Sequence, residues 1–139
     1  MRIYDGNNQT RITWETDTSG TPMRTILNEA NVPGQTRIWV WDGKNANERR
    51  RNIFSGYKSK RPPAPDEFYK TVSEVKRLLQ HSQAIQIEVP GYEADDVIYS
   101  VVKNWSRDEA VHVISTDRDL MPLTMLANVT SSQVPFMGV

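Results

Sequence analysis

The sequence predicts an α/β fold in which helices cover both faces of a mostly parallel central sheet. Short runs rich in β-branched and aromatic residues alternate with stretches whose apolar residues recur at helical spacing. This alternation implies βαβ units with right-handed crossovers. Several strand-like runs end in an aspartate, and the carboxyl ends of parallel strands share one edge of a sheet. With 139 residues, 37% of them apolar, the chain has room for one domain over 1–139.

The first half of the chain supplies two strands, and each is followed by an Asp-Gly pair. Residues 1–4 form a very short strand before Asp5, and residues 36–41, the clearest β signal, precede Asp42. A helix that opens at Pro22 lies between the two strands. A single Asp-Gly pair is usually only a turn, but two of them after two strands favour a shared role.

The second half alternates helices and strands. We expect helices over 65–80 and 94–105 and strands over 84–89 and 111–115, then a short helix or turn over 120–126 and a last strand over 129–134. The apolar stripe of the first helix consists of Phe68, Val72, Val75 and Leu79. The second helix is expected to bury Val97, Ile98, Val101, Val102 and Trp105. Core positions are also the safer expectation for Trp14, Trp39 and Trp41.

The segment from about 44 to 64 is basic and poorly periodic, and we expect it to be irregular. Between Lys44 and Arg77, ten Lys and Arg stand against four Asp and Glu, which leaves seven bases against thirteen acids elsewhere. The formal net charge of zero therefore hides a basic segment beside an acidic set. If cations neutralise the acids, this combination suits a phosphodiester. The alternative is a solvated basic face that binds nothing.

Seven acids follow strands or open a helix, and we interpret them as one divalent-metal site. Three carboxylates in GYEADD stand where a loop becomes a helix, and their repulsion would be offset by a cation. Oxygen ligands without His or Cys favour Mg²⁺ or Mn²⁺, and two such ions would activate a water and stabilise the leaving oxygen in phosphodiester hydrolysis. The predicted ligands are Asp5, Asp42, Glu93, Asp95, Asp96, Asp117 and Asp119.

Other classes of protein have little support in the sequence. Without cysteine there is no disulfide framework and no Cys-ligated zinc, which fits a reducing, cytoplasmic environment. His81 and His112 lie far apart, which argues against a histidine metal site or a Ser/His triad. Neither a leader nor an apolar run of membrane length occurs, so we expect no membrane association.

Taken in order, the blocks IYDGNN, WVWDGK, YKSKR, GYEADD and STDRDL resemble the catalytic domain of the 5'-nuclease, or flap endonuclease, family. This family includes bacterial and bacteriophage 5'-3' exonucleases. The resemblance implies a PIN-like three-layer fold, an arch-like segment at about 44–64, and metal-dependent cleavage of DNA near 5' ends and flaps. It also implies two divalent cations, the first surrounded by Asp5, Asp42, Glu93, Asp95 and Asp96 and the second by Asp117 and Asp119.

The YKSKR block resembles the base of the arch in that family. The resemblance assigns Tyr57 to stacking on a terminal base, and Lys58 and Arg61 to the scissile phosphate or its neighbour. A lysine beside an aromatic residue in a basic segment is also, on physical grounds, a reasonable phosphate clamp. More general phosphate contacts are expected of Arg49, Arg50, Arg51 and Lys60.

The family continues past the last matched strand into a further metal-site aspartate and a helix-three-turn-helix module that grips duplex DNA, whereas this sequence stops at Val139. The expected partner is DNA with a 5' end or flap, which can contain RNA, and a second polypeptide is one source of the duplex-binding module. Two alternatives stay open. One is a small PIN-type ribonuclease, and the other is a non-catalytic module that binds nucleic acid or a partner and keeps the acids as metal ligands or remnants.

Overall fold

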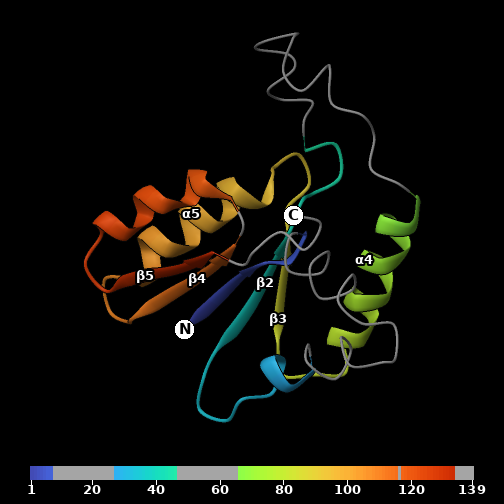
Figure 1. The fold of residues 1–139 in the computed structure, drawn as a ribbon, viewed down its shortest axis with the longest axis horizontal. Coiled ribbons are helices and arrows are strands. Elements are labelled where there is room, and N and C mark those ends of the chain that lie inside the picture. Colours follow the sequence, from blue (N-terminus) through green and yellow to red (C-terminus); the bar gives the residue numbers. More distant parts are fainter. Residues whose placement is uncertain (8–26, 47–65, 116, 134–139) are drawn as a thin grey trace, which may run out of the picture.

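The structure is a computed structural model that describes residues 1–7, 27–46, 66–115 and 117–133, and its centre is a five-stranded sheet in which every pair of neighbours is parallel (Figure 1). The predicted fold class is confirmed. The strands are β1 (Arg2–Asp5), β2 (Arg37–Trp41), β3 (Ile85–Glu88), β4 (Val111–Ser115) and β5 (Val129–Gln133).

Helices lie on both faces of this sheet, as the sequence predicts (Figure 1). The structure contains α4 (Asp66–Leu79), α5 (Ala94–Trp105) and the 3₁₀ helix η1 (Arg118–Met125), and residues 27–30 are also helical. The bounds of α5 and β4 agree with the expected ranges, and η1 begins two residues before the helix or turn expected at 120. In the described part of the chain, no helix is both long and apolar enough to cross a membrane.

The core on the α5 side of the sheet is aliphatic. Val97, Ile98 and Val102 of α5 pack with Ile3 and Val40 from the central strands. The list of residues expected to be buried on α5 is wrong in one member, Trp105, which is 49% exposed, and Val101 is only partly buried. The most deeply buried positions follow Ala94, Ile98 and Val102 at i, i+4 spacing and continue to Ser106, so Trp105 lies at the margin of the buried stripe.

The core on the α4 side is aromatic. Trp39 and Trp41 of β2 are each 1% exposed, so their expected place in the core is confirmed. The ring of Tyr4 stacks on that of Trp39 with a centroid distance of 4.0 Å. Three members of the predicted α4 stripe, Val72, Val75 and Leu79, are buried here, and Phe68 is half-buried. Trp14 lies outside the described residues.

The strand order places the carboxyl ends of β1 and β4 at the point where the chain changes direction across the sheet. The order is β3-β2-β1-β4-β5, so the chain starts in the middle, builds outward to β3, and then returns past β1 to build the other half. Open α/β sheets bind ligands outside the carboxyl ends of the strands at such a switch point. Asp5 ends β1 and Ser115 ends β4 at this position.

Candidate metal centre

All seven predicted metal ligands lie in described parts of the chain, at the carboxyl ends of strands or at helix starts. Asp5 ends β1, and Asp42 follows β2 directly. The others lie where two helices begin, with Glu93 as the N-cap and Asp95 and Asp96 in the first turn of α5, and with Asp117 as the N-cap and Asp119 in the first turn of η1.

Asp95 lies among three of the other acids, Asp5, Asp42 and Asp117. Burial raises the pKa of Asp95 to about 9, together with a side-chain hydrogen bond to Asp117 and the negative charges of Asp5, Asp117 and Asp42. The four residues come from four separate segments of the chain, so the sheet and the start of α5 bring them together. The raised pKa favours a protonated Asp95 carboxyl group in contact with Asp117.

Ser115 connects two of the four acids. Its hydroxyl donates to Oδ2 of Asp5 at 3.0 Å and accepts from the backbone N–H of Asp117 at 3.0 Å. Asp117 in turn accepts from the N–H of Asp119 through Oδ1 at 2.9 Å, which caps η1. Asp5 is only 3% exposed, so its carboxylate is fixed as well as buried. Ser115 is not among the predicted site residues, although a hydroxyl residue two positions before an aspartate at a strand end could have indicated its role.

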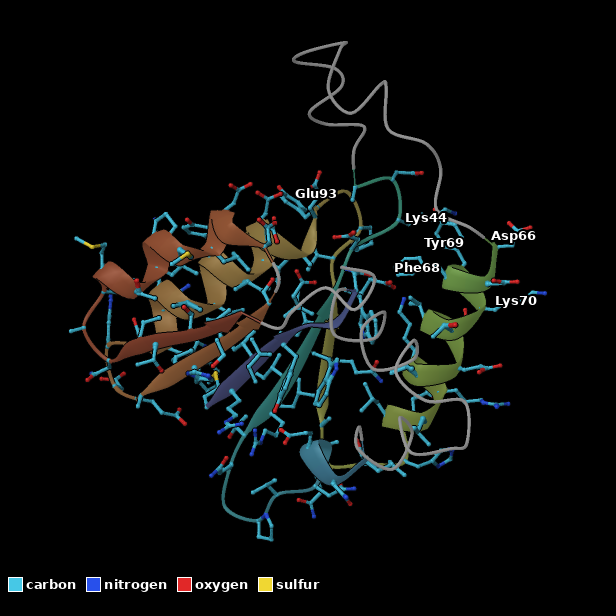
Figure 2. The ribbon with its side chains drawn as sticks, viewed as in Figure 1. Lys44, Asp66, Phe68, Tyr69, Lys70 and Glu93 are labelled. Carbon is cyan, nitrogen blue, oxygen red and sulfur yellow. The ribbon has the colours of Figure 1, made fainter. Side chains whose placement is uncertain are left out.

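Asp42 is fixed by the helix on the other side of the site. Its Oδ1 accepts from the N–H of Ala94 at 2.8 Å, which satisfies one of the unpaired donors in the first turn of α5. Glu93 lies directly before α5 (Figure 2). Its backbone is extended, and its side chain is 6% exposed. Glu93 is thus the N-cap of α5, and Asp96 lies three residues further on in its first turn.

The carboxylate oxygens suit a hard cation, although they are not positioned around a single point where an ion would bind. Within the described ranges, no three His, Cys, Asp or Glu side chains are placed to hold a metal ion as they stand. The carboxyl groups are instead hydrogen-bonded to N–H and O–H groups and to one another. Four carboxyl groups nevertheless meet there, and all offer the oxygen ligands that Mg²⁺ and Mn²⁺ prefer. Since Asp95 would have to lose its proton to act as a ligand, cation binding there would release that proton.

The predicted substrate-contacting residues lie outside the described residues, within 47–65. They are Arg49, Arg50, Arg51, Tyr57, Lys58, Lys60 and Arg61. Their roles stay predictions.

The parallel sheet in this strand order, with helices on both faces and acids gathered at the switch point, defines an α/β domain of the PIN-like class. The family model for the 5'-3' exonuclease N-terminal resolvase-like domain matches residues 7–135, and the chain belongs to this family.

Relatives and solved structures agree with this assignment. The chain is 33% identical over 116 residues to a 5'-3' exonuclease of Halalkalibacterium halodurans, covering 81% of this chain and 37% of that protein. It is 35% identical over 101 residues to a thermostable DNA polymerase I of Thermus filiformis, covering 72% of this chain and 12% of the polymerase. The fold matches the T5 D15 protein co-crystallised with metal ions, with a TM-score of 0.67 at 20% identity, over 95% of this chain and 54% of that one. The chain thus spans about half, or less, of the length of these proteins.

Proposed function

We propose that this chain is the catalytic part of a metal-dependent 5' nuclease that hydrolyses DNA phosphodiesters near 5' ends or flaps. The observation that carries the proposal is the meeting of Asp5, Asp42, Asp95 and Asp117 at the switch point of the sheet. Family membership adds the reaction class. A neighbour of the same fold, the T5 D15 flap endonuclease, has been solved in complex with DNA and metal ions, which supports DNA as the substrate.

The four acids at the centre would hold divalent cations, with Glu93, Asp96 and Asp119 as the remaining members of the predicted set. Bound Mg²⁺ or Mn²⁺ would supply a water activated at neutral pH and neutralise charge on the leaving oxygen. The contribution of the chain is to hold the donors in place. Ser115 fixes one oxygen of Asp5, and the N–H of Ala94 fixes one oxygen of Asp42.

Predicted contacts within 47–65 would complete the proposed site. Tyr57 would stack on the terminal base, and Lys58 and Arg61 would hold the scissile phosphate or its neighbour. Arg49, Arg50, Arg51 and Lys60 would contact the backbone further along the strand. In this proposal the acids bind the metal ions and the basic segment binds the DNA, in agreement with the distribution of charge along the sequence.

The test is cleavage of 5'-labelled flap and blunt duplex DNA, and of single-stranded RNA, in Mg²⁺, Mn²⁺ or EDTA. Asp117→Asn removes one charge from the centre of the cluster and keeps the size of the side chain. We expect it to reduce cleavage of flap DNA by about a hundredfold or more, because a metal ligand contributes several kcal/mol to stabilisation of the transition state. Asp108→Asn makes the same change at an exposed position just beyond the carboxyl end of α5 and should leave the rate unchanged.

Three results would contradict the proposal. They are no metal-dependent product from the wild-type chain, equal rates for wild type and Asp117→Asn, and cleavage of RNA in preference to every DNA substrate. The last result would favour the ribonuclease alternative. Salt-sensitive binding of DNA without turnover, even in high Mn²⁺, would favour a non-catalytic module. Thermal unfolding of each variant excludes loss of activity through misfolding.

A further inference from the structure

Two loops beside the acidic centre are joined backbone to backbone. Residues 42–44 follow β2, residues 91–94 lead into α5, and together they are called the paired loops. The N–H of Gly43 donates to the carbonyl of Tyr92 at 2.9 Å, and the N–H of Gly91 donates to the carbonyl of Lys44 at 2.8 Å. With the bond from Ala94 to Asp42, three hydrogen bonds connect segments about fifty residues apart in sequence.

The paired loops approach each other so closely that only certain residues fit. A Cβ atom added to Gly43 would lie 1.8 Å from the carbonyl oxygen of Val89, which no side chain could tolerate without a backbone shift. Gly91 has a φ of +84°, a conformation that other residues rarely adopt. The pairing therefore depends on the backbone and on two glycines, and it creates a fixed border for the site.

Two residues on this border, Lys44 and Tyr92, contribute backbone carbonyl groups to the pairing. The paired loops use the carbonyl groups of Lys44 and Tyr92, so the ammonium and the ring can change without loss of these hydrogen bonds. Tyr92 is 42% exposed, and Lys44 is also exposed. Within the described residues the Lys44 ammonium makes no ion pair, although acids are close to it in sequence and across the pairing. A half-exposed aromatic ring and a lysine are thus presented on a rigid support.

We infer that Lys44 and Tyr92 form a nucleotide clamp at the border of the metal centre, in which the ring of Tyr92 stacks on a base and the Lys44 ammonium contacts a phosphate. This inference rests on the proposed function and specifies how the same site positions its substrate. Tyr92 is adjacent to Glu93 in sequence, and its hydrogen-bond partner Gly43 is adjacent to Asp42. The stacked base therefore belongs to a nucleotide within a few positions of the scissile phosphate. Stacking on an exposed aromatic ring is tolerant of sequence, which suits an enzyme that recognises strand ends.

The clamp predicts separate signatures for its two members in DNA binding measured by fluorescence anisotropy in EDTA, where cleavage cannot interfere. Tyr92→Ala should weaken binding of flap DNA by about tenfold, while Tyr92→Phe should bind as wild type does. Lys44→Met should lower the slope of log K against log salt by about 0.7 to 0.9, the value for one phosphate contact. Trp105→Ala and Lys103→Met are the matched controls, because both residues lie in the last turn of α5, at the end far from the paired loops. They should change neither the affinity for flap DNA nor the salt slope.

Substrates with a single abasic position test stacking directly. Abasic sites are placed one at a time within three nucleotides on either side of the expected cleavage point. At one position the Tyr92→Ala defect should disappear, because the wild type has also lost its stacking partner there.

The inference is overturned if wild-type DNA binding is normal and Tyr92→Ala binds equally well, or if the defect has the same size on every abasic substrate. It is also overturned if the wild type does not bind DNA. If wild type and Tyr92→Ala show the expected pattern in EDTA but no cleavage occurs in Mg²⁺ or Mn²⁺, the clamp stands and the proposed nuclease function fails. The two ideas therefore fail in distinguishable ways.

Discussion

Two clusters of charged residues, one around Glu29 near the amino-terminal edge of the sheet and one around Asp95 at its carboxyl-terminal edge, differ in the signs of their members. At the amino-terminal edge, Glu29 accepts hydrogen bonds from Tyr4 and Arg37, and Arg2 lies 3.7 Å from it, so opposite charges are paired. At the carboxyl-terminal edge, the charged neighbours that raise the pKa of Asp95 are all carboxylates. The first arrangement stabilises the fold, whereas the second opposes it.

This difference separates paired opposite charges from clustered like charges in one small domain. Like charges that gather at a ligand-binding edge cost stability unless a cation or a proton intervenes. Opposite charges that pair, as around Glu29, contribute to stability without a bound ligand. Neutralising a charge should therefore destabilise the chain in the cluster around Glu29 and stabilise it in the cluster around Asp95.

The largest effect is expected at Arg37, which is 4% exposed and donates from Nη1 to the Tyr4 hydroxyl at 2.6 Å and to Glu29 at 3.3 Å. Arg37→Met keeps most of the buried aliphatic stem but removes both hydrogen bonds. We expect a loss of about 2 to 3 kcal/mol in the free energy of unfolding, measured by urea denaturation. The loss is limited because Glu29 stays partly exposed and can be solvated.

Arg2→Met is the matched control for this prediction. Arg2 is 41% exposed and lies further from the same carboxylate, so its removal should cost less than about 1 kcal/mol. Equal losses for the two variants would show that burial does not distinguish the two arginines. No loss for Arg37→Met would show that the pairing at this edge does not contribute to stability.

The contrast between the edges also shows what the sequence can and cannot predict. Periodicity located the strands and α5, because it records which side of an element faces the core. Position after a strand then predicted that Asp5, Asp42 and Asp117 would share an edge. The local sequence, however, does not predict the contact between Glu29 and Arg37, because that contact depends on how a helix packs on the sheet.

The pairing of the loops was equally hidden in the sequence. Gly43 and Gly91 could each be interpreted as ordinary turn glycines, and only the fold shows that their N–H groups reach across to the opposite loop. The exposure of Trp105 was missed because helical spacing allows both Trp105 and Ser106 at the inner face, and only the packing shows that Ser106 is the buried one. Partners that are distant in sequence were thus the main source of error.

A smaller effect of opposite sign is expected at Asp95. Its pKa of about 9 is raised above the ordinary value of 3.8, so its contribution to stability is fully present below about pH 4 and is lost as the pH rises toward 9. Asp95→Asn keeps a hydrogen-bond donor beside Asp117 at every pH. In EDTA at pH 8 we expect the variant to be more stable than the wild type by about 1 to 2 kcal/mol, a value discounted for solvent screening.

The stability difference between Asp95→Asn and the wild type should depend on pH and on Mg²⁺. The stability advantage of Asp95→Asn should shrink as the pH falls from 8 to 4. Millimolar Mg²⁺ at pH 8 should raise the unfolding temperature of the wild type more than that of the variant, because the cation binds the folded carboxylates. Asp108→Asn serves again as the control for the loss of one charge. A variant less stable than the wild type at pH 8 in EDTA would contradict the view that charge at this edge opposes folding.

The smallest effect is expected at Tyr4, whose hydroxyl joins the pair at the other edge by donating to Glu29 at 2.5 Å and accepting from Arg37. Tyr4→Phe retains the ring stacked on Trp39, so only the hydroxyl contacts are lost, at a cost of about 1 kcal/mol.

Burial, and then the hydrogen bond to Glu29, raise the pKa of Tyr4 to about 12. Because the unfolded phenol ionises near pH 10 and the folded one does not, the wild type should lose stability between pH 10 and 12, and Tyr4→Phe should lose less. Urea denaturation at pH 8 and pH 11 measures both quantities. If the two proteins decline equally above pH 10, the Tyr4 hydroxyl is not held neutral by its surroundings, and the contacts of Arg37 and Arg2 with Glu29 stabilise this cluster without it.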